Sequence, residues 1–172
     1  LREPSGTGFL YIRSSVLEKL DPPFIDFHAA SWTAENTFVL AEGARRFESG
    51  ETSNAGKIGM IEAVRYASRI GIGRIEQRVQ ALAETLRNRL REIGGVVVHD
   101  QGERKCGIVT FSKAGVTPDA ARKTLLAQHI NISISRIAYA RIDLGRRGLT
   151  DILRASVHYY NTEDEIERFC QA

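Results

Sequence analysis

The clearest pattern of apolar positions lies in the middle of the chain, where two stretches repeat at helical spacing. Across residues 58–67, apolar side chains recur every three or four positions, which predicts a helix. A second apolar stripe runs through residues 75–93, opposite a face rich in arginine and glutamate, and it predicts a helix of about six turns that packs on a sheet. Gly71 and Gly73 separate the two helices, and Gly94-Gly95 ends the second.

Short apolar runs after the second helix predict four strands, with further helices among them. The strands cover residues 96–99, 107–111, 130–134 and 153–159, and the helices cover residues 117–128 and 162–171. Thr162 is placed to cap the last helix, with Glu165 at the capping-box position. This order predicts an α+β fold, in which helices lie on one face of a mainly antiparallel sheet.

The pattern before residue 58 is less regular. Residues 8–13 form a short apolar run that predicts a buried strand, and Ser14 or Ser15 could cap a short helix that ends at Leu20, before two prolines. Residues 24–53 show no sustained period, and so long a loop in a compact protein is usually functional. We place a boundary between residues 1–72 and residues 73–172, where the two central helices meet.

Composition excludes several classes of protein. No apolar run approaches the roughly 20 residues that span a bilayer, so no membrane association is expected. The net charge is +3, from 24 Lys+Arg against 21 Asp+Glu, and the Arg141, Arg146 and Arg147 cluster lacks the aromatic residues that would stack bases, so no nucleic-acid partner is expected. Cys106 and Cys170 are far apart and form no metal-binding motif. A reducing cytoplasm is the expected location.

Four places could carry chemistry, and each has an ordinary structural alternative. Gly6 and Gly8 would permit a turn beside a cofactor, or a plain turn into a strand. Thr52 and Ser53 could bind a phosphate at a helix N-terminus, or only cap the helix. His28, with Trp32 near it, could line a pocket or pack within the loop, and Arg154, which starts an apolar strand, could bind a carboxylate or form a structural salt bridge.

Three segments in this order resemble one family across essentially the whole chain. They are Ser5-Gly6-Thr7-Gly8-Phe9-Leu10-Tyr11-Ile12, Arg46-Phe47-Glu48-Ser49-Gly50-Glu51-Thr52, and Arg154-Ala155-Ser156-Val157-His158-Tyr159-Tyr160-Asn161-Thr162-Glu163-Asp164-Glu165-Ile166. The chain resembles the C-terminal part of class V aminotransferases and cysteine-desulfurase-like enzymes, which have fold type I and use pyridoxal 5'-phosphate. The resemblance implies that residues 1–72 are a remnant of the large cofactor domain and that residues 73–172 are the small C-terminal domain.

The resemblance also implies roles for individual residues. Gly6 and Thr7 would follow the lysine that forms the Schiff base with the cofactor, and that lysine would lie upstream of Leu1, because all five lysines of the chain come after this turn. Arg154 would bind the α-carboxylate of an amino-acid substrate, with Arg141, Arg136 and His28 as further candidates.

For the cofactor phosphate, the resemblance implies Glu51 and Thr52. The desulfurase branch has a threonine directly after the glycine that corresponds to Gly50, and that threonine reaches the phosphate bound by the partner subunit. Here Glu51 takes that position and Thr52 follows it. The resemblance therefore implies a homodimer with shared active sites.

The presence or absence of a persulfide cysteine distinguishes the branches of this family. Desulfurases of this kind carry a persulfide cysteine in the loop before the strand that begins near Arg154, whereas residues 135–152 contain none and Cys106 is expected within a strand. This favours the aminotransferase or epimerase-like branch. The isolated chain is expected to be inactive, because it lacks the Schiff-base lysine. The alternative is a non-catalytic dimerisation or binding module derived from the same fold.

Overall fold

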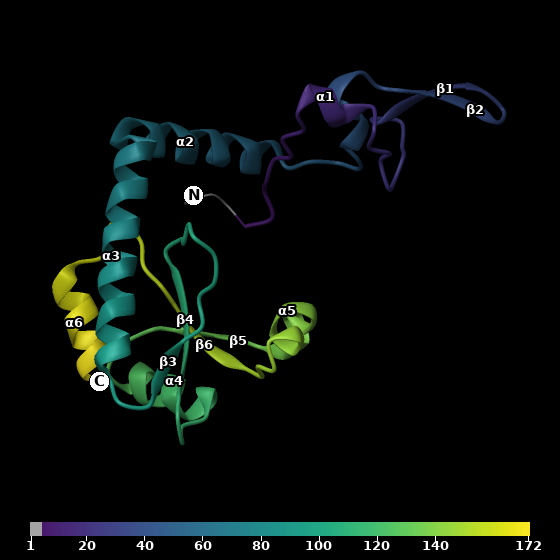
Figure 1. Ribbon diagram of the computed structural model, residues 1–172. Helices are drawn as coiled ribbons and strands as arrows, with labels where there is room; N and C mark the ends of the chain where they lie inside the picture. Colours follow the sequence, from purple (N-terminus) through teal and green to yellow (C-terminus); the bar gives the residue numbers. More distant parts are fainter. Residues whose placement is uncertain (1–4) are drawn as a thin grey trace. The chain divides into compact units, whose positions relative to one another are not determined.

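The computed structural model describes residues 5–172, which form two compact units, one that ends at Arg69 and one from Ile70 to Ala172. The first unit contains nearly all of the long helix α2, Asn54–Ile70, and the second begins with α3, Ile72–Glu92 (Figure 1). Gly71 separates the two helices with a backbone φ of 98°, a conformation that glycine adopts at little cost. Both central helices are confirmed.

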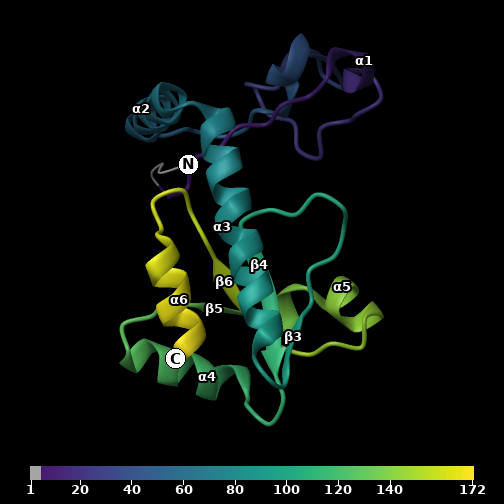
Figure 2. The same cartoon turned by 60° about the vertical axis from the view of Figure 1, so that its left-hand side comes forward.

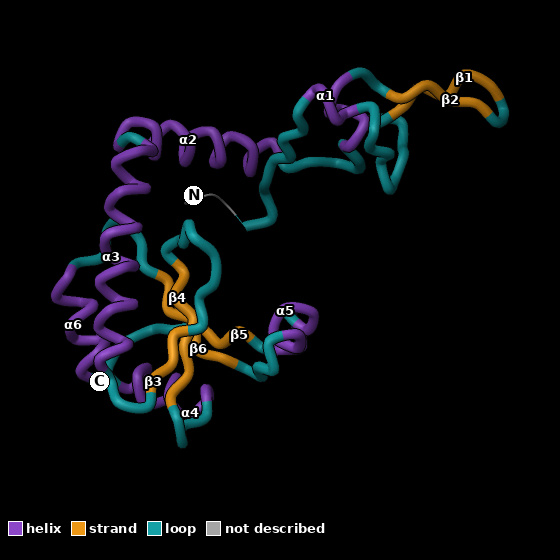
Figure 3. Tube along the Cα trace, viewed as in Figure 1, coloured by secondary structure: helices purple, strands orange, loops and turns teal. Residues whose placement is uncertain are grey.

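The second unit is built on a four-stranded sheet, drawn in orange in Figure 3. Its strands are β3 (Val96–Val98), β4 (Ile108–Lys113), β5 (Ser133–Ser135) and β6 (Ile152–Ser156). Their order is β3-β4-β6-β5, and each neighbouring pair is antiparallel. The predicted strands and the antiparallel α+β class are confirmed.

Three helices supply the hydrophobic core of this unit. They are α3, α4 (Pro118–Ala127) and α6 (Glu163–Gln171), and Figure 2 shows α3 and α6 side by side. Their apolar side chains pack with those of one sheet face in a core of Leu82, Ala83, Leu86, Leu90, Val109, Phe111, Leu125, Ile132, Leu153, Ala155 and Ile166. The apolar stripe expected from the sequence therefore lies at the centre of the unit. Burying each of its leucines contributes about 1.5–3 kcal/mol to the stability of the fold.

The last helix begins as its sequence predicts. The Thr162 hydroxyl accepts a hydrogen bond from the Glu165 backbone N–H at 3.2 Å, and the Glu165 carboxylate accepts one from the Thr162 N–H at 3.0 Å. This capping box satisfies two backbone donors that the helix leaves free.

The segment between β5 and β6 differs from expectation. It contains a 3₁₀ turn, η2 (Ile137–Tyr139), and a short helix, α5 (Arg141–Arg146), where the sequence suggested only a loop. Leu144 is 2% exposed and anchors α5, which is too short for a repeating apolar stripe to predict. Cys106 is also corrected: it is exposed and lies before β4 rather than within a strand.

The first unit contains α1 (Ser14–Leu17), a two-stranded hairpin of β1 (Ala30–Ala34) and β2 (Thr37–Leu40), the 3₁₀ turn η1 (Gly43–Phe47), and α2 up to the end of the unit. The strand expected at residues 8–13 is absent. No strand of the described residues pairs with this segment, and an isolated strand would leave its backbone groups unpaired. The side chains of Phe9 and Tyr11 are 72% and 79% exposed. Neither Ser14 nor Ser15 caps α1, whose N-cap is Arg13.

The hairpin was missed because residues 24–53 were treated as irregular. Trp32 faces Phe38 across the two strands, and Glu35-Asn36 forms the turn between them. Aromatic and β-branched residues on both sides of a two-residue turn are typical of a hairpin, so the signal was present in the sequence.

Gly107 lies at a close approach between α3 and the sheet. A Cβ there would lie 2.6 Å from Val79 Cγ1 and 2.7 Å from the Val157 carbonyl oxygen. Because the backbone cannot yield as a flexible side chain can, we expect Gly107→Ala to lower the free energy of unfolding by about 1–3 kcal/mol. Gly73→Ala on α3 meets no atom within 4 Å and should be neutral or stabilising. Urea denaturation of both variants measures the difference, and equal stabilities would contradict it.

Candidate functional site

Arg154 lies in the middle of β6, on the sheet face opposite the hydrophobic core. Its neighbours Leu153 and Ala155 both belong to the core, and side chains alternate between the faces of a strand. Thr110 of β4 and Ser133 of β5 stand directly opposite Arg154 on the two adjacent strands. Directly opposed residues have Cβ atoms about 4.5–5.5 Å apart, so Arg154 is flanked by two hydroxyl-bearing side chains.

The same face carries further hydroxyl groups beside three apolar residues, Val97, Ile108 and Ile152. Alternation from Thr110, Ser133 and Arg154 places further hydroxyl groups beside them, from Ser112, Ser135 and Ser156. No strand position on this face carries a carboxylate. We call these six residues the hydroxyl face, and its one formal charge is the Arg154 guanidinium.

The guanidinium of Arg154 is partly buried, and its Nε has no hydrogen-bond partner among residues 5–172. Other arginines of this unit differ: Arg78 binds Glu163 with nitrogen-to-oxygen distances of 2.5 and 3.0 Å, and Arg89 binds Glu167 at 2.6 and 2.9 Å. A buried, unpaired donor costs about 1–3 kcal/mol. The structural salt bridge considered for Arg154 therefore finds no partner in the described part of the chain, and the side chain fits a carboxylate ligand.

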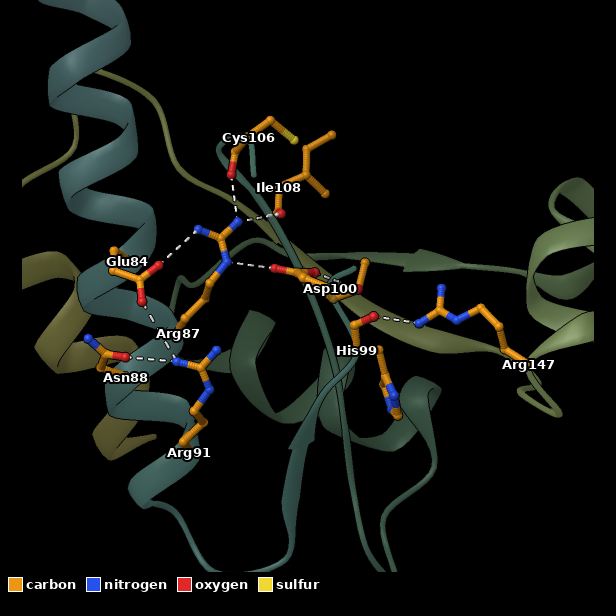
Figure 4. A network of polar contacts seen from close by, with 10 residues as sticks. Glu84, Arg87, Asn88, Arg91, His99, Asp100, Cys106, Ile108 and Arg147 are labelled. Carbon is orange, nitrogen blue, oxygen red and sulfur yellow. Dashed lines mark hydrogen bonds and ion pairs between the residues drawn. The ribbon is translucent and has the colours of Figure 1, made fainter. Parts of the chain in front are cut away.

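Arg87 and Asp100 are the buried pair of a polar network (Figure 4). Arg87 of α3 is 2% exposed, and its Nε donates to Asp100 Oδ2 at 2.7 Å, while its Nη2 donates to the carbonyls of Cys106 at 2.6 Å and Ile108 at 3.3 Å. Asp100 Oδ1 accepts from both the backbone N–H and the hydroxyl of Thr110, at 2.8 and 2.7 Å. Burial raises the pKa of Asp100, but the hydrogen bonds from Thr110 and Arg87 outweigh it and hold that pKa below its usual value. Sequence reasoning missed this network.

The segment that carries Arg141 contacts neighbouring segments through Arg136 and Arg147. Arg147 donates to the carbonyl of His99 and to Asp143, and burial together with the nearby Arg147 charge lowers the pKa of His99. Arg136 binds both Asp119 and Asp151, at 2.6 and 2.7 Å. Arg136 is therefore a structural residue rather than a free candidate, whereas Arg141 is exposed at the start of α5.

In the first unit, two candidate segments for the cofactor lie in contact. A Cβ at Gly56, in the first turn of α2, would lie 2.5 Å from Thr7 Cγ2, so the turn that contains Gly6 and Thr7 packs against the start of α2. Ser53, not Thr52, caps this helix: its hydroxyl accepts from the Gly56 N–H at 3.1 Å. Thr52 is exposed and precedes the cap.

Asp26 holds the loop that leads to this helix. Its carboxylate accepts hydrogen bonds from the backbone N–H groups of Gly50 at 2.6 Å, His28 at 2.8 Å and Ala29 at 3.2 Å. These bonds, with that from Gly50 the strongest, lower the pKa of Asp26 from 3.8 to about 2. Gly50 has a φ of 65° and directly precedes Glu51. Asp26 therefore fixes where the Glu51-Thr52 segment begins.

His28 and Trp32 have different surroundings. His28 Nδ1 lies 3.5 Å from Asp26 Oδ2, and the His28 ring packs on Phe27. Trp32 is 80% exposed on the hairpin. His28 thus belongs to the Asp26 loop, and its role in substrate binding stays a prediction.

The Asp26 loop should be sensitive to acid. Because the pKa of Asp26 in the fold lies below its ordinary 3.8, the stabilisation is fully present above pH 3.8 and is lost as the pH falls toward about 2. Trp32 fluorescence should report this transition, and Asp26→Asn should be less stable at neutral pH and lack it. Asp21→Asn, at an exposed acid of the same segment, is the control. Identical acid profiles for the Asp26 variant and the unmodified protein would contradict the expectation.

The described residues contain neither a cluster of metal-binding side chains nor a helix long and apolar enough to cross a membrane. The cysteines at 106 and 170 are both free thiols. Burial raises the pKa of Cys170, which disfavours the nucleophilic thiolate at that position.

The layered α+β unit has counterparts among known proteins. The chain belongs to the class V aminotransferase family, whose model matches residues 2–169. It is 30% identical over 168 residues to a probable cysteine desulfurase of Methanothermobacter thermautotrophicus, with 95% of this chain and 42% of that protein covered. It is 32% identical over 172 residues to a probable cysteine desulfurase of Xylella fastidiosa, with 98% of this chain and 40% of that protein covered.

Solved structures agree with this assignment. The cysteine desulfurase of Thermococcus onnurineus matches with a TM-score of 0.77 and 28% identity, over 94% of this chain and 40% of that chain. The cystine C-S lyase C-DES, in a variant structure with glycine covalently linked to the pyridoxal-phosphate cofactor, matches in fold with a TM-score of 0.77 at 23% identity, over 99% of this chain and 42% of that chain. This chain thus spans about two fifths of these proteins. The family expected from the three segments is confirmed, although these relatives bear the desulfurase name rather than that of the favoured branch.

Proposed function

We propose that this chain is the C-terminal part of a pyridoxal-phosphate-dependent enzyme that acts on an amino acid, and that Arg154 binds the α-carboxylate of the substrate. The observation that carries the proposal is the Arg154 Nε, which is buried among the hydroxyl face without a hydrogen-bond partner in residues 5–172. Arginine presents a planar fork of donors that matches a carboxylate. The small-domain position in a class V family member supports the same role.

The first unit offers groups that suit the cofactor phosphate. Thr7, the Thr52 hydroxyl and the start of α2 lie in neighbouring segments, and a helix N-terminus favours an anion. The negative charge of Glu51 would repel the phosphate, so the Glu51 carboxylate would have to point away from it. When bound, pyridoxal phosphate supplies an electron sink for reactions at the α- or β-carbon of an amino acid, and this chain would orient the substrate and hold the phosphate.

The reaction itself divides into two candidates. The residues between β5 and β6 contain no cysteine, which favours transamination, epimerisation or a related reaction without a protein persulfide. The names of the relatives favour release of sulfur from cysteine. The absent cysteine concerns this chain directly, so we place the reactions without a persulfide first.

The experiment uses a full-length protein that contains this chain. After incubation with pyridoxal phosphate, its absorbance should show an imine band, and the band should change on addition of amino acids from a panel that includes L-cysteine and L-alanine. Keto acid or the D-isomer as product supports the first candidate, and alanine, with sulfide released once a thiol reductant such as dithiothreitol is added, supports the second. A protein that never shows the imine band contradicts both, and a non-catalytic binding module becomes the better description.

We also propose that the full-length protein is a homodimer with shared sites. The support is the family resemblance at residues 50–52, where a threonine of one subunit serves the other in the desulfurase branch. Light scattering on the full-length protein measures its mass, and a monomer at working concentration would contradict the proposal.

A further inference from the structure

Asp100 is linked to the strand position opposite the unpaired Arg154 through Thr110. It binds both polar groups of Thr110, and Thr110 is the residue of β4 directly opposite Arg154. An arginine without a partner attracts the nearest free carboxylate. If Asp100 were released, its charge would compete with that of a substrate.

The hydrogen bonds of Asp100 hold its carboxylate in place, which keeps it from pairing with Arg154. Oδ2 accepts from Arg87 Nε at 2.7 Å, and Oδ1 accepts two hydrogen bonds from Thr110. Arg87 is in turn fixed by the carbonyls of Cys106 and Ile108. Asp100 is 8% and Arg87 is 2% exposed, so water cannot easily replace either partner.

We propose that Arg87 and Thr110 are positioning residues that keep the Asp100 carboxylate engaged, so that Arg154 stays available for the carboxylate of a substrate. This inference rests on the proposed function, because it takes Arg154 as the substrate-binding group. It assigns no contact with substrate to Arg87, Asp100 or Thr110. Their effect on binding passes through Arg154.

Thr110 allows the cleanest test, because two substitutions separate its hydroxyl from its shape. Thr110→Val keeps the size and suits a strand and removes the hydroxyl hydrogen bond to Asp100 while the backbone N–H bond stays, whereas Thr110→Ser keeps the hydroxyl. In the full-length protein, Thr110→Val should raise KM for the amino acid about tenfold with kcat nearly unchanged. Thr110→Ser should stay close to the unmodified enzyme.

The double variant Thr110→Val with Asp100→Asn distinguishes competition from a structural defect. The amide cannot form an ion pair with Arg154 yet can still accept from Arg87, so the double variant should regain most of the affinity. A merely structural loss would not be corrected by removing a charge. Thermal unfolding of each variant is measured alongside, and saturation-transfer NMR with propionate, added to the full-length protein without cofactor, reports carboxylate binding independently of turnover.

The outcomes are distinct. A raised KM for Thr110→Val that Asp100→Asn restores supports the inference. An unchanged KM for Thr110→Val, or a raised KM that the second substitution does not restore, overturns it. Arg154→Gln is measured in parallel: if it too leaves KM unchanged, the proposed role of Arg154 has failed, and if it alone raises KM, only the inference about Asp100 has failed.

Discussion

Arg154→Gln in the full-length protein should lower kcat/KM for the amino-acid substrate about 100-fold, which corresponds to about 2.7 kcal/mol of lost transition-state stabilisation. Glutamine retains polarity but loses the charge and the fork of donors that a carboxylate binds. Because the Arg154 Nε has no hydrogen-bond partner within residues 5–172, the substitution should remove the proposed ligand contact without breaking a hydrogen bond of that nitrogen. Steady-state kinetics and thermal unfolding together measure the effect, and the melting temperature should fall little.

Arg141→Gln is the matched control for Arg154, because Arg141 is an exposed arginine of the same unit and the second candidate for the carboxylate. Its kcat/KM should stay close to that of the unmodified enzyme. A loss with Arg141→Gln and none with Arg154→Gln would transfer the carboxylate site to the start of α5.

The largest effect on stability is expected at Arg87. Replacing it with methionine leaves the Asp100 carboxylate, 8% exposed, without its charged partner, and it also removes a donor from the Cys106 and Ile108 carbonyls. Breaking a buried ion pair on one side costs about 3–5 kcal/mol. Urea denaturation should show a loss of this size, and part of it should return in the double variant Arg87→Met with Asp100→Leu, which buries no charge.

Arg89→Met on the same helix is the control for Arg87. Arg89 also binds carboxylates, those of Glu92 and Glu167, but its side chain is 40% exposed, and exposed ion pairs contribute about 0–1 kcal/mol. Similar losses for Arg87→Met and Arg89→Met would mean that burial does not set the strength of the Arg87 pair.

The second unit could be predicted largely from its sequence, because local patterns agree with tertiary packing. The apolar stripe of α3 and the capping box at Thr162 each determine an element without help from distant residues. The first unit was harder: residues 8–13 have the composition of a strand, but a strand also needs a neighbour to pair with, and none pairs with them in the described residues. A sequence window cannot supply that information.

In the candidate site, too, some residues could be expected from the sequence and others could not. Arg154 was selected because a charge stands inside an apolar strand, and its role as the carboxylate ligand stays a prediction. Arg87 was missed although it follows Leu86 in the buried stripe, since its partner Asp100 lies 13 residues away, beyond β3. The Asp26 contact to Gly50 spans 24 residues and leaves no local signal. Contacts of this kind depend on the folded chain.

The alternation along β6 has a consequence for how such a protein can change. Leu153 and Ala155 serve the core, while Arg154 and Ser156 face away from it. Under the proposed function, adjacent codons of β6 fall under separate selection, one set for folding and the other for the ligand. The hydroxyl face can be altered at Ser133, Ser135 or Ser156 with little effect on the packed layer behind it, so one scaffold can acquire a new substrate preference in single steps.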